Sequence, residues 1–553
     1  MGNRTFEMTF REAIPPGEGG YPGFKPRTEK AKGMIIDRDI SVKMRDGIKI
    51  YIDVFRPEQE GKYPVLVNWG PYGKFCRLKY DIRGNCGIED KDINEYTAFE
   101  AGDPVYWCRN GYVLINPDPR GAWNSEGDIT FMSDQEAEDC YDLIEWAGTQ
   151  DWSNGKVGMQ GVSYLAWSQW RVAALNPPHL AAINPWEGVS DFYREMAYHG
   201  GIPETHFRSL FQSNLSFSTT RVEDYEIMAK EHPLFDDYWT SKNADLSKIT
   251  VPAFIVASWS DHGLHNRGTI EGFKQIASKD KWLLVHGQKK WAHFYHPENV
   301  EKQRQFFNRF LKGFDNRVKE WPRVTLEVRE RIYVQGIRTE REWPPLRTQY
   351  RKLFLNAGNG ELGLSPLEEP DQVSYDVNDI RDKTQNACFE FEFDNQTELT
   401  GYMKLKLWVE ADGSDDMDLF VAIEKIDPMG YRVPFAFFGN HDDGPVALGW
   451  LRASHRELDE ERSTPDQPFH THRKEIKLKA GEIVPVEIEI WPSSTLFHRG
   501  EKLRVVVQGS DIHTYPEERH TNQHTDSVNR GKHIIHAGGI YDSHLLVPVI
   551  PTG

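Results

Sequence analysis

The stretch KVGMQGVSYLAWSQW, residues 156–170, places one serine, Ser163, between an apolar run and a segment with helical periodicity. A strand that turns sharply into a helix at a serine is the setting of a nucleophile elbow, which lifts the hydroxyl above the sheet edge. The small residue Gly161 avoids a clash there, and the following helix N-terminus stabilises negative charge. The pattern Gly-x-Ser-x-Gly is incomplete, because Leu165 holds its last position. An ordinary helix-capping serine remains the alternative interpretation.

A serine nucleophile needs a general base and an acid that orients the base. The strand-like run VPAFIVASWSDHG contains Asp261 just after its apolar part, and WLLVHGQKKWAH offers His286 at a strand end and His293 in the loop beyond. The order Ser, Asp, His is that of α/β-hydrolases. Each residue alone has a simpler explanation as a loop or strand-end side chain. Three other histidines compete for the role of base: His262, His265, which is close to Asp261 in sequence, and His296.

An acyl-transfer site also needs two donors for the oxyanion. The backbone N–H of Tyr164, directly after the serine, is one candidate. The run PVLVNWGPYGK places Tyr72 in the loop after an early strand, where its hydroxyl could be the second donor. The alternative interpretation of Tyr72 is a packing residue.

The elements that must position these residues can be read from the pattern. Residues 34–70 alternate like strands, SDQEAEDCYDLIEWAGTQ predicts a helix begun by Ser133, and strands then alternate with helices as in a parallel sheet. The alternation stops from about residue 188 to 248, where helices predominate, and resumes afterwards. From residue 321 the runs alternate apolar and polar residues, which predicts an all-β sandwich of the jelly-roll type.

We therefore predict the fold class α/β: residues 1–187 and 249–320 form an α/β-hydrolase domain, 188–248 a helical cap insertion and 321–553 a C-terminal jelly roll. The 553 residues carry a net charge of -18, which disfavours nucleic acid and anionic membranes as partners. Five widely spaced cysteines indicate neither a disulfide framework nor a zinc site. No secretory signal or membrane-spanning run is recognisable, so a cytoplasmic location is expected. The oligomeric state, including a homodimer, stays open.

Several segments together resemble the cocaine-esterase and X-Pro dipeptidyl-peptidase (CocE/NonD) family of serine hydrolases over nearly the whole chain. NWGPYGK resembles the segment with the oxyanion tyrosine, at Tyr72, and GVSYLA the nucleophile segment, with Ala166 in place of a glycine. ASWSD resembles the strand end that carries the acid, Asp261. DPRGAWNSEGD and ALGWLRASHREL resemble two further signatures, the second in the C-terminal domain. The resemblance implies hydrolysis of small esters, amides or X-Pro peptides through an acyl-enzyme, without metal or organic cofactor.

The chain departs from the family pattern at the base. The family has Gly-Pro-Trp-x-His after the last strand, where this sequence reads GQKKWAH from residue 287. Matching Trp-x-His selects His293 as the base, and matching the strand end selects His286. An X-Pro peptidase would also need an acid for the peptide amine, and the cap region offers four: Glu187, Asp191, Glu195 and Glu204.

Two other classes compete with a serine hydrolase. A metal-dependent hydrolase could use the histidines near residue 290, but no metal-binding spacing such as HExxH occurs. A non-catalytic binding protein with a degraded triad is the other, because the base segment is altered. Reaction with an active-site serine probe separates an enzyme from a binding protein.

Overall fold

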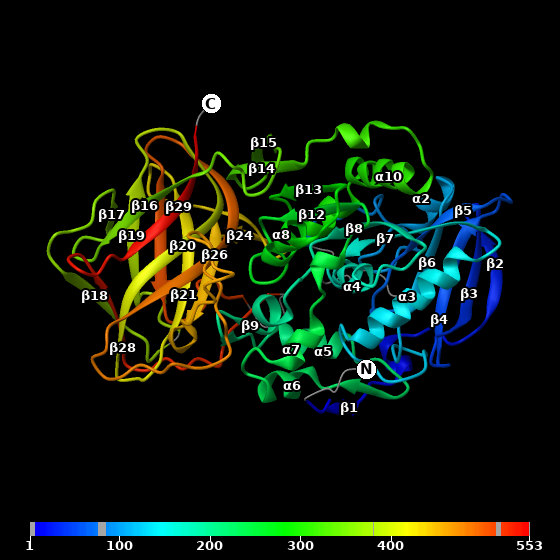
Figure 1. Ribbon diagram of the computed structural model, residues 1–553, viewed down its shortest axis with the longest axis horizontal. Coiled ribbons are helices and arrows are strands. Elements are labelled where there is room, and N and C mark those ends of the chain that lie inside the picture. The colour runs from blue at the N-terminus through cyan, green and yellow to red at the C-terminus, as the bar shows by residue number, and fades with distance from the viewer. Residues whose placement is uncertain (1–5, 76–84, 380, 516–520, 552–553) are drawn as a thin grey trace.

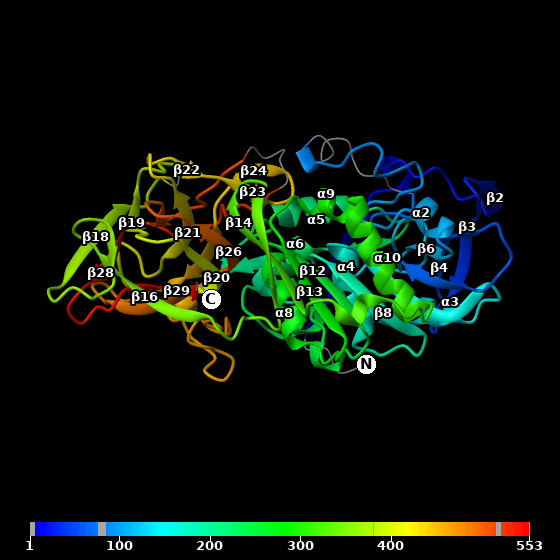
Figure 2. The ribbon, with the colours of Figure 1, turned by 90° about the horizontal axis from the view of Figure 1, so that it is seen from above.

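The computed structural model describes residues 6–75, 85–379, 381–515 and 521–551. Two parts lie end to end along the long axis of the molecule (Figures 1 and 2). Strands and helices alternate in the first part, which is drawn on the right of Figure 1. The second part, on the left, consists mainly of strands.

The first part is built on one sheet with the strand order β2–β3–β4–β6–β5–β7–β8–β12–β13–β14–β15. The strands from β6 through β14 in this order pair in parallel, and the others pair antiparallel. The carboxyl ends of the parallel strands therefore meet at one edge, which is where an α/β sheet places its site. The strand bounds are β2 Arg27–Ala31, β3 Met34–Lys43, β4 Lys49–Pro57, β5 Tyr63–Val67, β6 Val113–Asp118, β7 Ser153–Val162, β8 Leu180–Trp186, β12 Ala253–Ser258, β13 Lys281–His286, β14 Val324–Arg331 and β15 Val334–Glu340.

Helices cover both faces of this sheet. Successive strand residues point to opposite sides, and apolar residues on both sides pack against helices. Val65 and Val67 belong to the apolar cluster shared with helices α3, α4 and α8, whereas Leu66 belongs to the cluster shared with α2, α9 and α10. The Ser133 hydroxyl accepts a hydrogen bond from the Glu136 N–H at 3.1 Å and caps α3, as predicted. The helix bounds are α2 Pro104–Arg109, α3 Asp134–Gly148, α4 Tyr164–Ala173, α8 Asn266–Gln275, α9 Lys290–Tyr295 and α10 Pro297–Leu311.

Between β8 and β12 the chain leaves the sheet and forms mostly helices, in agreement with the predicted change of pattern. The N-terminal arm joins this region, because β1 pairs antiparallel with β11. The predicted bounds of the insertion, 188–248, stay a prediction. The elements are β1 Phe10–Glu12, a π-helical turn Tyr193–Ala197, β9 Tyr198–His199, β10 Ile202–Pro203, α5 Phe207–Asn214, β11 Arg221–Glu223, α6 Tyr225–Glu231 and α7 Asp237–Lys242.

The second part packs its strands around a separate apolar cluster. Along β20 the alternate residues Met403, Leu405 and Leu407 are buried, which is the pattern that predicted an all-β domain. The assignment to the jelly-roll class stays a prediction. The strand bounds are β16 Gln349–Asn356, β17 Glu361–Gly363, β18 Asp371–Asp376, β19 Asn386–Glu392, β20 Thr397–Asp412, β21 Asp418–Ile426, β22 Arg432–Val433, β23 Phe435–Phe437, β24 His441–Gly444, β25 Ala447–Arg452, β26 Val484–Phe497, β27 Lys502–Gln508, β28 Lys532–Ala537 and β29 His544–Ile550.

The two parts are tied together at the sheet edge and at α8. Strands β14 and β15, which lie beyond the predicted domain boundary at residue 321, continue the sheet of the first part. Arg267 of α8 forms an ion pair with Glu489 of β26 at 3.0 Å, and the Phe438 N–H donates to the Ser260 carbonyl at 2.8 Å. The β-domain thus buttresses the loop that follows β12. The chain has an α/β-hydrolase region followed by an all-β domain.

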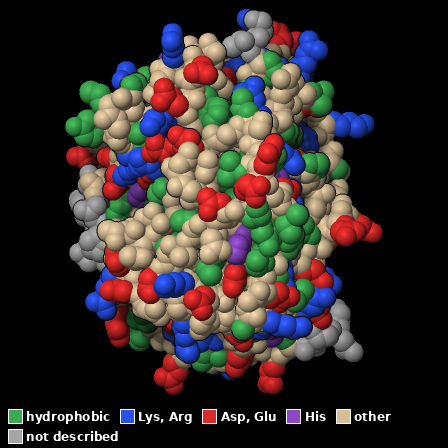
Figure 3. Space-filling model, turned by 90° about the vertical axis from the view of Figure 1, so that its left-hand side faces the viewer, with side chains coloured by type: hydrophobic (Ala, Val, Ile, Leu, Met, Phe, Trp, Pro, Cys, Tyr) green, Lys and Arg blue, Asp and Glu red, His purple; other side chains and the backbone are tan. Residues whose placement is uncertain are grey.

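The surface of the β-domain end carries acidic and basic side chains in alternation (Figure 3). On this face the basic side chains do not gather into one patch, as they would on a nucleic-acid-binding face. Within the described part of the chain, no helix has both the length and the apolar character that crossing a membrane requires.

Candidate active site

Ser163 lies at a sharp turn between the end of β7 and the start of α4. Its backbone has φ 58° and ψ -117°, a conformation that costs energy for a residue with a side chain. A Cβ on Gly161 would lie 2.5 Å from the Leu165 Cβ, so the turn admits only glycine there. The Ser163 N–H donates to the Trp186 carbonyl at 3.0 Å and joins the turn to β8. This strained strand–serine–helix geometry is that of a nucleophile elbow.

The side chain that meets Ser163 is His265. The Ser163 Oγ lies 3.1 Å from His265 Nε2, and His265 Nδ1 bonds to Asp261 Oδ2. Asp261 follows β12 in the loop, and His265 stands four residues later, directly before α8. Both side chains are buried. A hydroxyl, an imidazole and a carboxylate in this order form the hydrogen-bonded chain of a catalytic triad.

The structure does not bring His293 or His286, the two histidines favoured from the sequence, to Ser163. Residues 290–295 form the helix α9 instead of a loop, and the His293 ring stacks on the His286 ring with 3.9 Å between centroids. His286 Nε2 lies 3.1 Å from Glu187 Oε1. The expected position for the base is therefore occupied by a stacked histidine pair, and His265 approaches Ser163 from the loop after β12.

A local signal for His265 was present in the sequence. Residues spaced i and i+4 share one face of a helical turn, so the spacing of Asp261 and His265 lets both side chains meet. Of the other competing histidines, His262 accepts a hydrogen bond from the Leu448 N–H at 3.4 Å, and His296 is exposed. The sequence therefore offered His265 as a competing base, whereas the resemblance to the family favoured His293 and His286, at and after the end of β13.

Lys290, at the start of α9, completes the surroundings of the triad. Its Nζ lies 3.0 Å from Asp261 Oδ2 and 3.3 Å from His265 Nδ1. Burial alone would raise the pKa of Asp261, but the Lys290 charge and the hydrogen bonds from His265 and Lys290 outweigh burial and hold this pKa well below its usual range. Burial, assisted by the Lys290 charge, lowers the pKa of His265 to about 4. The imidazole is therefore neutral at pH 7 and free to accept a proton.

The two residues predicted to bind the oxyanion lie next to each other. The rings of Tyr72 and Tyr164 are 6.2 Å apart, and Tyr72 also packs on Phe99 at 4.8 Å. The Tyr72 hydroxyl hydrogen-bonds the carboxyl of Glu100. The Tyr164 hydroxyl donates to Glu136 Oε2 at 2.9 Å and is therefore already engaged. The backbone N–H of Tyr164 lies at the start of α4 and is the group of this residue that could donate to an oxyanion.

The DPRGAWNSEGD segment supports the loop that carries Tyr72. Asp118 Oδ1 accepts a hydrogen bond from the Lys74 N–H at 2.8 Å, and the Ser125 hydroxyl donates to the Asp118 carbonyl at 2.7 Å. Arg120 pairs with the buried Asp139 of α3 at 2.6 Å. These contacts give the segment a positioning role close to the site.

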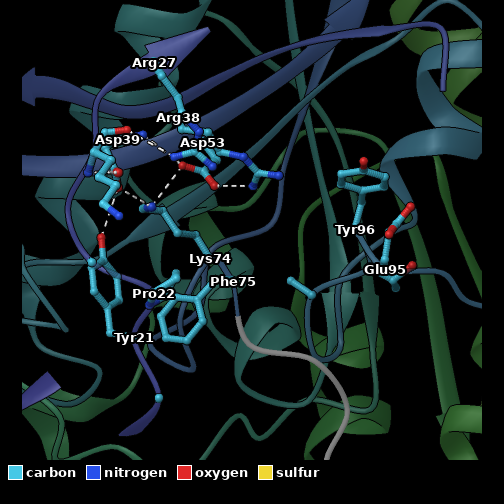
Figure 4. Close-up of a pocket in the computed structure, with 15 residues that line it drawn as sticks. Tyr21, Pro22, Arg27, Arg38, Asp39, Asp53, Lys74, Phe75, Glu95 and Tyr96 are labelled. Carbon is cyan, nitrogen blue, oxygen red and sulfur yellow. Dashed lines mark hydrogen bonds and ion pairs between the residues drawn. The ribbon is translucent and has the colours of Figure 1, made fainter. Parts of the chain in front are cut away.

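A cavity of about 580 Å³ lies beside this loop (Figure 4). Its floor holds Lys74, whose ammonium is 2.6 Å from Asp39 and 2.9 Å from Asp53. Arg38 pairs with Asp53 at 2.6 Å, and the Tyr21 hydroxyl donates to Asp39 at 3.0 Å. These charges already neutralise one another, so their main effect is to anchor the loop between Tyr72 and Lys74.

We expect Lys74→Met to loosen this loop. It leaves the carboxylates of Asp39 and Asp53 buried without their shared cation, and breaking a buried ion pair costs about 3–5 kcal/mol. The thermal unfolding midpoint should fall, and kcat/KM for an ester substrate should fall with it. The control is Lys25→Met, because Lys25 lines the same cavity with an exposed side chain. An unfolding midpoint equal to that of the wild type would contradict the anchoring role.

Within the described residues, no group of three or more His, Cys, Asp or Glu side chains is arranged to hold a metal ion. The described cysteines Cys108, Cys140 and Cys388 are free thiols, and Cys76 lies outside the described residues.

Comparison with known proteins gives two matching sequence families. Residues 46–295 match the X-Pro dipeptidyl-peptidase (S15) family, and residues 316–546 match the X-Pro dipeptidyl-peptidase C-terminal non-catalytic domain. The first match includes Ser163, Asp261 and His265. The sequence is also 25% identical to the cocaine esterase of Rhodococcus sp. (strain MB1 Bresler), over 93% of this chain and 98% of that protein.

Among solved structures, a CocE/NonD family hydrolase from Staphylococcus aureus superimposes with a TM-score of 0.92. It is 42% identical to this chain, and the superposition covers 100% of this chain and 99% of the other. An aminopeptidase from a Thaumarchaeota archaeon superimposes with a TM-score of 0.71 at 16% identity, over 95% of this chain and 98% of that one. The second likeness shows a shared fold.

Proposed function

The chain belongs to the CocE/NonD family of serine hydrolases, and from this premise we propose that it hydrolyses carboxylic esters through an acyl-enzyme on Ser163. The observation that carries the proposal is the contact of 3.1 Å between Ser163 Oγ and His265 Nε2, with Asp261 on the opposite ring nitrogen. In this proposal His265 is the general base, in place of His293 or His286.

The reaction proceeds in two halves. His265 Nε2 takes the hydroxyl proton as Ser163 Oγ attacks the ester carbonyl carbon, and Asp261 stabilises the imidazolium. The Tyr164 N–H donates to the oxyanion, and the Tyr72 hydroxyl joins it by turning its proton from Glu100 to the substrate. The imidazolium then gives its proton to the departing alcohol. A water molecule, deprotonated by His265, attacks the acyl-enzyme, and Ser163 recovers its proton when the acid leaves.

Ester hydrolysis is favoured over X-Pro peptide cleavage by the surroundings of the acids in the cap region. A dipeptidyl-peptidase must bind the charged peptide amine with an acid that is available to the substrate. Asp191 pairs with Arg194 at 2.7 Å and Glu195 with Arg267 at 2.8 Å. Glu204 accepts several backbone N–H groups, among them that of Phe207 at 2.7 Å, and Glu187 contacts His286. The name of the Rhodococcus relative also points to esters.

A substrate panel tests this preference. We expect kcat/KM for p-nitrophenyl acetate and butyrate to exceed that for Ala-Pro-p-nitroanilide by at least about 10²-fold, because the amide is less reactive and its amine lacks a partner. A higher value for the anilide would replace the proposal by an X-Pro dipeptidyl-peptidase. Failure of all three substrates, together with no labelling of Ser163 by a fluorophosphonate, would favour a non-catalytic binding protein. The cytoplasmic location stays a prediction, and the oligomeric state stays open.

A further inference from the structure

Behind the triad lies a buried cluster of charged groups organised around Lys290. The Lys290 side chain is 1% exposed, and its ammonium also lies near the aromatic rings of Trp291, at 4.9 Å, and Phe438, at 5.8 Å. Three carboxyl groups contribute to its electrostatic surroundings: those of Asp261, Glu187 and Glu100. A buried ammonium is stable only where a negative charge balances it. The charge states of the three carboxyl groups therefore determine which of them balances the positive charge of Lys290.

Only Asp261 carries the balancing charge. Burial raises the pKa of Glu100 to about 8, although Lys290 opposes the shift. Burial and the Asp261 charge raise the pKa of Glu187 far above its usual range. Burial thus favours the protonated, neutral form of both glutamates. The cluster then holds one cation, Lys290, and one anion, Asp261.

Unpaired carboxyl oxygens support this assignment. Asp261 Oδ1 and Glu187 Oε2 are buried, and neither has a hydrogen-bond partner when both groups are ionised. The two side chains are within hydrogen-bonding reach of each other. A proton on Glu187 Oε2 would donate to Asp261 Oδ1 and satisfy both atoms. Asp261 would then accept from Glu187 at one oxygen and from Lys290 and His265 at the other.

This arrangement sets the tautomer of His265. The ionised carboxylate of Asp261 can only accept, so the His265 Nδ1 that bonds to Oδ2 carries the proton, and Lys290 donates to the same oxygen. His265 Nε2 then remains the acceptor for the Ser163 hydroxyl. We propose that Lys290 is a positioning residue, which keeps Asp261 ionised and, through its charge beside the imidazole, sets the lower pH limit of catalysis. The inference rests on the triad of the proposed function.

The sign of the pH effect follows from the groups around the imidazole. The positive charge of Lys290, 3.3 Å from Nδ1, opposes formation of the imidazolium, whereas the Asp261 carboxylate favours it. A general base works only when neutral, so activity is lost as pH falls through its pKa. Removing the ammonium should therefore move this loss to higher pH. The polar and titratable groups in this surrounding are Ser163 on the elbow, Asp261 in the loop after β12, Glu187 after β8, Glu100 before α2, His286 on β13 and Lys290 on α9.

The test measures kcat/KM for p-nitrophenyl acetate between pH 4 and pH 9. We expect the acid limb of the wild type to lie below the ordinary histidine pKa of about 6.5. The limb of Lys290→Met should lie at least about one pH unit higher, whereas Lys290→Arg, which keeps the charge, should stay near the wild type. The matched control is Lys289→Met, because the Lys289 ammonium pairs with Asp442 at 3.0 Å and does not serve the triad. Its profile should equal that of the wild type.

Three outcomes would overturn the inference. The first is a Lys290→Met profile with the acid limb of the wild type, which would make Lys290 a space-filling residue. The second is a Lys290→Arg limb displaced as far as that of Lys290→Met. The third outcome needs only the wild type and so does not depend on the folding of Lys290→Met. It is a rate of fluorophosphonate labelling that reaches half of its maximum at pH 6.5 or above. If the wild type is not labelled at any pH, the proposed function fails instead, so the two failures are distinguishable.

Discussion

Replacing Ser163 by alanine is expected to reduce kcat for p-nitrophenyl butyrate by about 10⁶-fold, the size of effect seen when a triad nucleophile is removed. The reason is structural as well as chemical. Ser163 Oγ lies 3.1 Å from His265 Nε2, on a turn whose strained backbone holds the hydroxyl over the sheet edge. Initial rates at saturating substrate measure the loss. Mass spectrometry after fluorophosphonate treatment should find the label on the Ser163 peptide of the wild type.

A neighbouring serine provides the control for this prediction. Ser168 lies on the same helix, α4, and is buried, but its hydroxyl donates to the Trp69 carbonyl at 3.1 Å and away from His265. Ser168→Ala should therefore keep kcat within about tenfold of the wild type, since it removes one ordinary buried hydrogen bond. Full activity in Ser163→Ala would refute the proposed mechanism at its centre.

Replacing His265 by alanine is expected to reduce kcat by about 10⁴–10⁶-fold, because Ser163 then lacks the group that takes its proton. The rate of fluorophosphonate labelling should fall in parallel, since phosphonylation also needs an activated hydroxyl. A separate variant tests Asp261, whose carboxylate bonds to the His265 imidazole. Asp261→Asn should reduce kcat to a similar extent through the wrong tautomer of His265.

His293 is the matched control, because the resemblance to the family selected it as the base. In the structure its ring stacks on His286 at 3.9 Å and it lies on α9, one turn after Lys290. His293→Gln is expected to lower the unfolding midpoint through lost packing while kcat stays within about tenfold of the wild type. The opposite pattern, with His265→Ala active and His293→Gln inactive, would restore the assignment made from the sequence.

The amino-acid sequence alone determined the features that depend on short segments. The apolar run before Ser163 and the helical pattern after it predict the elbow, because strand, turn and helix are set within about 15 residues. Asp261 was found in the same way, as the acid that directly follows a buried strand. The change from strand–helix alternation to period-two alternation predicted the all-β domain, since a half-buried sheet requires that period.

Which histidine lies against Ser163 was decided only by the tertiary structure. Several histidines lie near strand ends, and their sequence positions do not say which side chain crosses the edge of the sheet to Ser163. The outcome depended on residues 290–295 forming α9, which turns His293 onto His286 and directs Lys290 to Asp261. It also depended on the β-domain, whose Phe438 N–H holds the Ser260 carbonyl next to Asp261. Contacts between segments this far apart follow from the packing of the whole chain, which a local pattern does not encode.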